Sequence, residues 1–70
     1  MKKELTDQQK KVYEFIAAFI KIRGFPPCLQ EVATGLNMKS RSNIHRIVAE
    51  LKKKGYVSSK PLLARTIRVR

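Results

Sequence analysis

A single cysteine and a single histidine leave this 70-residue chain without a disulfide or a structural zinc site to hold a fold together. A structural zinc ion is normally held by four ligands, and Cys28 and His45 supply only two. The apolar core must therefore stabilise the fold alone, although a chain this short buries only about 60% of its unfolded surface. Hydrophobic residues make up 43% of the sequence, which excludes a disordered basic tail. The length allows one domain and excludes most enzymes with a deep cleft.

Positive charge dominates the sequence and is concentrated in its second half. The chain has 16 Lys and Arg against five Asp and Glu, a net charge of +11. Residues 1–38 hold six basic and four acidic residues, whereas residues 39–70 hold ten basic residues and one acidic residue. This balance favours an acidic partner, most commonly nucleic acid. A membrane surface and an acidic protein remain open at this point, and a charge run can also be a solvated face.

The sequence lacks the marks of an exported or membrane-embedded protein. No apolar signal core follows residues 1–4, and no apolar run approaches the length of a membrane span. A lone cysteine is typical of a reducing compartment. We therefore expect a cytoplasmic protein with no cofactor, no metal and no small-molecule substrate.

A T-x-x-Q sequence at Thr6 and Gln9 predicts where the first helix begins. In such a capping box the Thr hydroxyl accepts a hydrogen bond from the backbone N–H of Gln9, and the Gln side chain reaches back. The apolar stripe that follows consists of Val12, Phe15, Ile16, Phe19 and Ile20. We expect this stripe, with its phenylalanines, to lie in the core. Gly24 suits a left-handed helix end and Pro26 forbids continuation, so the helix spans about 7–22.

A short second helix is predicted after the prolines, over about 28–36. Val32, Ala33 and Leu36 give it a buried face. Asn37 is one of the few residues besides glycine that tolerate the left-handed conformation, so we expect it to end the helix. Residues 37–39 then form a tight turn.

The third predicted helix, over about 41–54, has the clearest pattern in the chain. Ser40 is a good N-cap, and Gly55 ends the helix after three lysines that suit the negative end of its dipole. Its apolar positions, at i, i+3, i+4 and i+7, are Ile44, Ile47, Val48 and Leu51.

The pattern changes to a period of two after Gly55. Residues 56–58 and 66–70 are predicted as short strands, the second half-buried, with a basic turn between them. They form a hairpin over about 56–70. Three helices, a short turn before the third, and a terminal hairpin predict one domain over 1–70. The fold class is mainly α (α+β), a three-helix winged helix-turn-helix with a C-terminal two-stranded β-hairpin wing.

One face of the third predicted helix carries side chains that can read DNA bases. Advancing 100° per residue from buried Ile44 places Arg46 near the opposite pole. The solvent face reads Arg41, Ser42, Asn43, His45, Arg46, Ala49 and Lys53. Arg can pair with guanine and Asn with adenine. These residues crowd the N-terminal half, the end that a recognition helix inserts into the major groove.

Other residues are placed for phosphates rather than bases. Lysines 52–54 lie further along the third helix, and Lys39 lies in the turn before it. The first N–H groups of the helix that Thr6 caps can also bind a phosphate. A basic hairpin fits the neighbouring backbone or the minor groove, and its basic residues are Lys60, Arg65, Arg68 and Arg70.

Four segments together resemble the DNA-binding domain of the LexA repressor family. Residues 24–33 look like its G-x-P-P-[ST]-x-x-E-[IV]-A segment, and residues 39–46 resemble the branch that reads S-x-S-x-I-H-R. Residues 51–57 are similar to its L-x-x-K-G-[YFL]-[IV] helix exit, and residues 61–69 to its P-x-x-x-R-[AT]-[IL]-x-[VI] wing. The resemblance covers nearly the whole chain.

This resemblance implies a repressor module that binds bipartite double-stranded DNA operators, as in the SOS response to DNA damage. By position, the family's recognition segment falls on Ser40, Arg41, Ser42, Asn43, His45 and Arg46, and its wing on Lys60 and Arg65. The DNA-backbone set is completed by Thr6, Lys39, Lys52 and Lys53.

The chain departs from the family pattern in three places. Cys28 stands where the family usually has Ser or Thr to cap the second helix, and Asn37 replaces a common Gly. The chain also stops where the family's hinge would begin. The Ser/Lys self-cleaving site and the dimer interface of the family lie beyond that point, so we expect no self-cleavage, and a homodimer on DNA stays open.

Two other classes of function are weighed against DNA binding. A protein-interaction winged helix would dock the same basic face on an acidic partner. An enzyme would need paired carboxylates, a triad or a phosphate loop, and Glu31 and Glu50 lie on different helices without a partner group. We expect Cys28 to be a half-buried helix start rather than a nucleophile, and His45 to face DNA or solvent rather than a metal.

Overall fold

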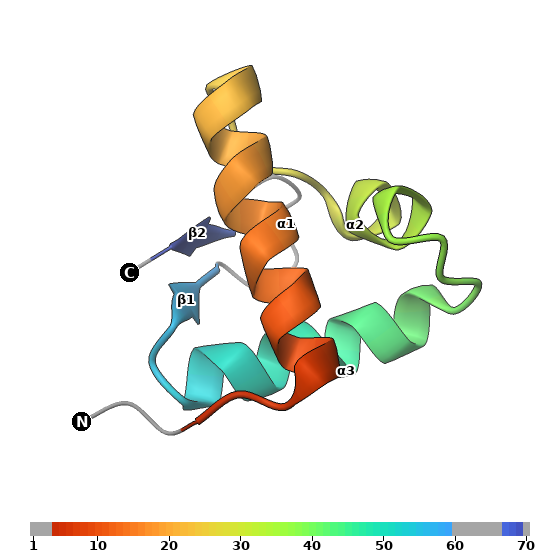
Figure 1. Cartoon of the computed structure of the whole chain (residues 1–70), viewed down its shortest axis with the longest axis vertical. Helices are drawn as coiled ribbons and strands as arrows, with labels where there is room; N and C mark the ends of the chain where they lie inside the picture. The colour runs from red at the N-terminus through yellow and green to blue at the C-terminus, as the bar shows by residue number, and fades with distance from the viewer. Residues whose placement is uncertain (1–3, 60–66, 70) are drawn as a thin grey trace.

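Three helices and a C-terminal pair of strands make up the described part of the chain, residues 4–59 and 67–69 of a computed structural model (Figure 1). In chain order the elements are α1 (Asp7–Arg23), α2 (Leu29–Gly35), α3 (Arg41–Lys53), β1 (Val57–Ser58) and β2 (Arg68–Val69). The strands are antiparallel, with Val57 opposite Val69 and Ser58 opposite Arg68. The predicted fold class, a winged helix-turn-helix, is confirmed.

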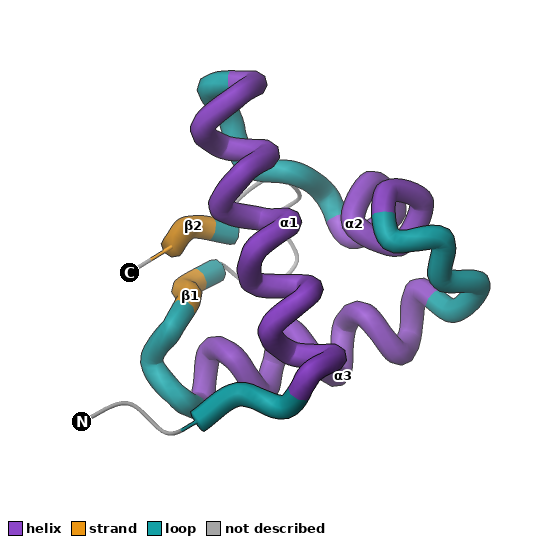
Figure 2. The backbone as a smooth tube through the Cα atoms, in the orientation of Figure 1, coloured by secondary structure: helices purple, strands orange, loops and turns teal. Residues whose placement is uncertain are grey.

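The three helices surround a small core. In Figure 2, α3 crosses behind the N-terminal half of α1, with α2 on one side of this pair and the two strands on the other. The C-terminal half of α1 extends beyond α3 (Figure 1). This crossing leaves the face of α3 that points away from α1 uncovered by the described elements.

The start of α1 follows the predicted capping box. The Thr6 hydroxyl accepts from the backbone N–H of Gln9, and Gln9 Oε1 accepts from the backbone N–H of Thr6, both at 3.2 Å. At the other end Gly24 has a φ of 81°, and its N–H donates to the Ile20 carbonyl. The helix ends at Arg23, one residue beyond the predicted end.

The other two helices end in the same hydrogen-bonded turn, the Schellman motif. After α2, Asn37 takes a φ of 56° as predicted, and the Met38 N–H donates to the Ala33 carbonyl at 2.8 Å. After α3, Gly55 has a φ of 86°, and the Tyr56 N–H donates to Leu51 in the same way at 3.0 Å. A left-handed residue two positions after the last helical residue makes both turns possible.

The three helices, β1 and the residue before β2 contribute to the core. Its buried apolar residues are Val12, Ile16, Val32, Ala33, Ile44, Ile47, Val48, Leu51, Val57 and Ile67. The whole predicted stripe of α3 is among them. Because α3 packs its full apolar face inward, its register relative to α1 is fixed by side-chain packing.

The predicted apolar stripe of α1 enters the core only in part: Val12 and Ile16 are buried, whereas Phe15, Phe19 and Ile20 are only partly buried. Of these three, Phe15 and Ile20 pack against the core. The Phe15 ring lies against Gly35 of α2. The Phe15 and Phe19 rings pack on each other with centroids 6.0 Å apart.

The hairpin also differs from the prediction. Within the described residues each strand spans two residues, and Tyr56 lies outside β1. Ile67 is buried, whereas Val69, expected on the same covered face, is 36% exposed. The remaining residues of the predicted hairpin, 60–66 and 70, lie outside the described residues.

The contact between α1 and α2 predicts an unfavourable substitution at Gly35. A Cβ at this position would overlap the ring of Phe15. We expect Gly35→Ala to lower the free energy of unfolding by about 1 kcal/mol, because this overlap outweighs the better helix propensity of Ala. In a Phe15→Ala background the same change should be neutral or stabilising. Urea unfolding of the four proteins checks this, and equal effects in both backgrounds would contradict it.

Candidate nucleic-acid interface

The uncovered face of α3 brings most of the predicted base-reading residues together. Among these, Ser40, Arg41, Ser42, His45 and Arg46 are exposed and Asn43 is half-buried. Lys39, Lys52 and Lys53 are also exposed around the same helix, and Thr6 is exposed at the start of α1. The predicted wing residues Lys60 and Arg65 lie outside the described residues. Arg68, on β2, is exposed.

Ser40 has a structural role at this surface. Its Oγ accepts from the Asn43 backbone N–H at 3.2 Å and so caps α3, as predicted. The capping bond uses an acceptor lone pair, so the hydroxyl proton is left for another acceptor. The cap also determines where α3 begins and therefore which side chains lie in its first turn.

Arg46 is held by two acceptors on its own helix. Its Nη2 donates to Asn43 Oδ1 at 2.7 Å, and its Nη1 donates to Glu50 Oε1 at 3.3 Å. The Arg46 side chain is 64% exposed and the Glu50 side chain 41% exposed. An exposed ion pair of this kind adds about 0–1 kcal/mol to stability, so an incoming acceptor can replace it.

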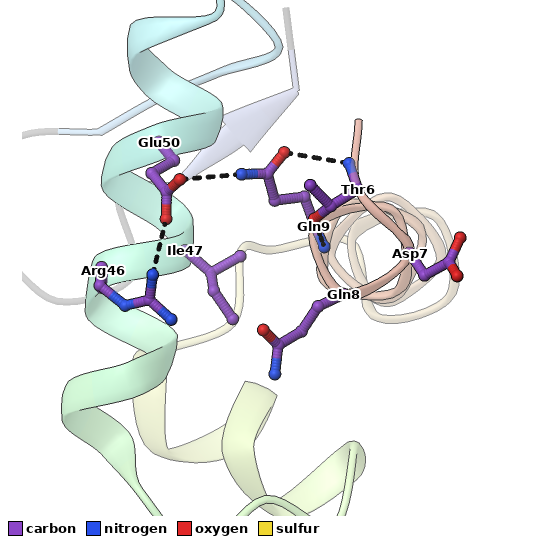
Figure 3. Close-up of a pocket in the computed structure, with 7 residues that line it drawn as sticks. All are labelled: Thr6, Asp7, Gln8, Gln9, Arg46, Ile47 and Glu50. Atoms are coloured by element: carbon purple, nitrogen blue, oxygen red, sulfur yellow. Dashed lines mark hydrogen bonds and ion pairs between the residues drawn. The ribbon is translucent and has the colours of Figure 1, made fainter. Parts of the chain in front are cut away.

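Gln9 connects this surface to the start of α1 (Figure 3). Gln9 is 5% exposed, and its Nε2 donates to Glu50 Oε2 at 3.0 Å. Its Oε1 accepts from Lys54 Nζ at 2.7 Å as well as from the Thr6 N–H. One buried amide therefore joins the cap of α1, the acid of α3 and the lysine that follows α3.

This network corrects two expectations from the sequence. Glu50, expected to lack a partner group, binds Arg46 and Gln9. Lys54, expected to be suited to phosphates, donates to the backbone carbonyl of Glu4 at 2.9 Å and to Gln9. The Arg46 and Glu50 spacing of four residues could have indicated the ion pair. The contact between Gln9 and Glu50 joins residues far apart in sequence, so local patterns do not signal it.

An open cleft of about 390 Å³ separates the start of α1 from the middle of α3. Its lining residues are Thr6, Asp7, Gln8, Gln9, Arg46, Ile47 and Glu50. In Figure 3 the Gln8 side chain extends from α1 toward α3 across this space. The carboxylates of Asp7 and Glu50 line the cleft beside Arg46, which makes the cleft a poor site for an anion.

Two other predicted roles can be placed on the structure. Lys52 Nζ donates to the backbone carbonyl of Ser59 at 3.1 Å, which links α3 to the end of β1. Cys28 is half-buried, as expected, and its backbone N–H donates to Glu31 Oε1 at 2.9 Å. Glu31 thus supports the start of α2 where the usual Ser or Thr cap is missing.

Comparison with known proteins identifies the family of the chain. A sequence profile described as LexA DNA binding domain matches residues 2–66. The chain belongs to this LexA family. It is 39% identical over 69 residues to the LexA repressor of Caldicellulosiruptor saccharolyticus, and 33% identical over 66 residues to that of Finegoldia magna. These matches cover 99% and 94% of the chain but 34% and 32% of the relatives, so the chain spans about a third of their length.

Membership of the LexA family confirms the resemblance inferred from the four sequence segments. The helix-turn-helix consists of α2, the turn at Asn37 and α3, and the wing includes β1 and β2. Within the described residues, no helix is long and apolar enough to cross a bilayer.

The buried Gln9 amide generates a stability prediction for this LexA-family domain. Gln9→Ala would leave the Glu50 and Lys54 groups without their shared partner and would remove half of the α1 capping box. We expect the free energy of unfolding to fall by about 1–3 kcal/mol. Gln8→Ala is the matched control, because Gln8 is an exposed neighbour of the same type. Urea unfolding that shows equal stability for the two variants would refute a structural role for Gln9.

Proposed function

We propose that the 70 residues act as one winged helix-turn-helix module that binds double-stranded DNA sequence-specifically and serves in transcriptional repression. The observation that carries this proposal is the exposed polar and basic face of α3, held outward by a fully buried apolar stripe. Membership of the LexA DNA-binding domain family supports it, and so does the net charge of +11. The relatives that match the chain are named LexA repressors.

In the proposed mechanism α3 enters the major groove with its N-terminal half. The base-reading set is Ser40, Arg41, Ser42, Asn43, His45 and Arg46. Arg side chains can donate to guanine O6 and N7, which distinguishes guanine from the other bases in the major groove. The exposed positions of Arg41 and Arg46 support this role, since neither needs a change of fold to reach a base edge.

Backbone contacts would then fix the register of α3 on the duplex. We assign them to Thr6, Lys39, Lys52 and Lys53, and to Lys60 and Arg65 of the wing. The wing lies on the adjacent backbone or in the minor groove. One module on a single half-site would bind DNA weakly. We therefore propose that two copies occupy a bipartite operator, where pairing raises the apparent affinity. Such a repressor acts in the bacterial cytoplasm, and we assign the chain no catalytic role.

Selection of bound sequences from a pool of random duplex DNA tests the proposed function. We expect enrichment of a defined sequence, and tighter binding of that selected duplex than of a scrambled duplex of the same composition. Affinity for both should fall steeply with salt, because phosphate contacts release counterions. Two half-sites at fixed spacing would indicate a pair of copies, and one half-site a monomer. Equal binding of both duplexes at every salt concentration would contradict sequence-specific recognition.

The base-reading role of Arg46 makes a separate prediction. Arg46→Ala should weaken binding to the selected duplex by about 1–3 kcal/mol, because a bidentate contact to a base is lost. Lys21→Ala removes the same charge from the last turn of α1, where Lys21 is exposed, and is the control. Titration of labelled duplexes measures both. If the two variants lose the same affinity, Arg46 contributes charge alone and does not read a base.

A further inference from the structure

An acidic side chain on the proposed DNA-reading helix needs an explanation. Glu50 is the one acidic residue between positions 39 and 70, and it lies on α3 among basic residues. A carboxylate near a DNA backbone repels phosphate. Its ion pair with Arg46 is exposed, has the less favourable order of charges along a helix, and so adds little to stability. The ion pair with Arg46 does not by itself account for Glu50 at this position.

The Glu50 carboxylate is held from a second helix. Gln9 Oε1 accepts from Lys54 and from the Thr6 N–H, so the Gln9 amide can present only its Nε2 to Glu50. The 3.0 Å bond from Gln9 Nε2 to Glu50 Oε2 follows from this orientation. Gln9 is 5% exposed and lies between α1 and α3. The Glu50 carboxylate is therefore hydrogen-bonded to a buried side chain rather than to an exposed one.

A fixed carboxylate in turn restricts Arg46. Glu50 Oε1 and Asn43 Oδ1 accept from different nitrogens of the same guanidinium, at 3.3 Å and 2.7 Å. An arginine without such partners has many rotamers and can reach phosphates in many directions. Held at two nitrogens, the guanidinium starts in a limited set of orientations over the α3 surface, and its charge is partly balanced by Glu50.

We propose that Glu50, anchored by Gln9, is a positioning residue that directs Arg46 to base edges and keeps it from phosphates. The negative charge beside Arg46 disfavours a phosphate at that place, whereas a neutral base edge meets less repulsion. Glu50 therefore determines the ratio of specific to non-specific affinity rather than the affinity for DNA as such. This inference rests on the proposed function, in which Arg46 reads a base.

The test compares Glu50→Gln with Glu14→Gln in the full 70-residue chain. Both variants remove one negative charge, and Glu14 is exposed on α1 and lies outside the Gln9 network. Affinities are measured for the selected duplex and the scrambled duplex at several salt concentrations. We expect Glu50→Gln to tighten binding to the scrambled duplex and to lower the specificity ratio about tenfold, within the range of one base contact. Its salt slope on scrambled DNA should steepen by about one ion.

The control variant should shift the affinities for both duplexes by the same factor and leave the specificity ratio unchanged. An equal ratio in Glu50→Gln and Glu14→Gln would overturn the proposal, since only general charge would then be involved. The double variant Arg46→Ala, Glu50→Gln adds a second criterion. Once Arg46 is absent, removal of the Glu50 charge should no longer change the ratio. A specificity ratio lower in the double variant than in Arg46→Ala alone would also overturn the proposal.

Glu50→Asp separates position from charge and provides a test should Glu50→Gln not fold. Aspartate keeps the charge but is one methylene shorter, which withdraws the carboxylate from Arg46. We expect a lower specificity ratio with an unchanged salt slope, with folding checked by circular dichroism. A native ratio in this variant would contradict the positioning role. If the wild-type chain does not prefer the selected duplex over the scrambled one, the proposed function itself is wrong. If the wild type prefers the selected duplex and the Glu50 variants prefer it equally, only this inference is wrong.

Discussion

The packing of the α3 apolar stripe against α1 is the contact on which the rest of this small domain depends. The stripe residues Ile44, Ile47 and Leu51 are at most 1% exposed, and they meet Val12 and Ile16 in one core. No disulfide reinforces it, since the chain has a single cysteine. Because the buried face takes the whole apolar side of α3, the polar side must point outward. The proposed DNA-reading surface is thus a geometric consequence of the core.

Local signals in the sequence were sufficient for most of the fold. The Thr6 capping box, the Ser40 cap and the left-handed Asn37 involve residues within a few positions of one another, and each appears as expected. Such features depend on short-range sterics and hydrogen bonds, which a single sequence displays directly. The α3 stripe is predictable for the same reason, because its period coincides with the helix period and all four positions are buried.

The predictions that failed depend on what lies next to a residue in space. Periodicity indicates that Phe15 and Phe19 share a face with Ile16, but it does not tell which neighbouring element lies against that face. Both rings are only partly buried, and the Phe15 ring lies against Gly35 of α2. At the candidate surface, too, some features follow from local sequence and others from contacts between helices. The exposure of Arg46 follows from the helix period, whereas the contact of Glu50 with Gln9 requires the crossing of α1 and α3.

Gln9 connects the local structure at the start of α1 with the tertiary contact between α1 and α3. The same amide oxygen that caps α1 also accepts from Lys54, and these two bonds turn the amide nitrogen toward Glu50. A residue that local sequence identifies as a helix cap therefore also fixes a charge on the surface of another helix. The start of α1 and the exposed face of α3 cannot shift independently, because one buried side chain is hydrogen-bonded to both. In a domain this small, the residues that define the fold are close enough to the candidate interface to shape its chemistry.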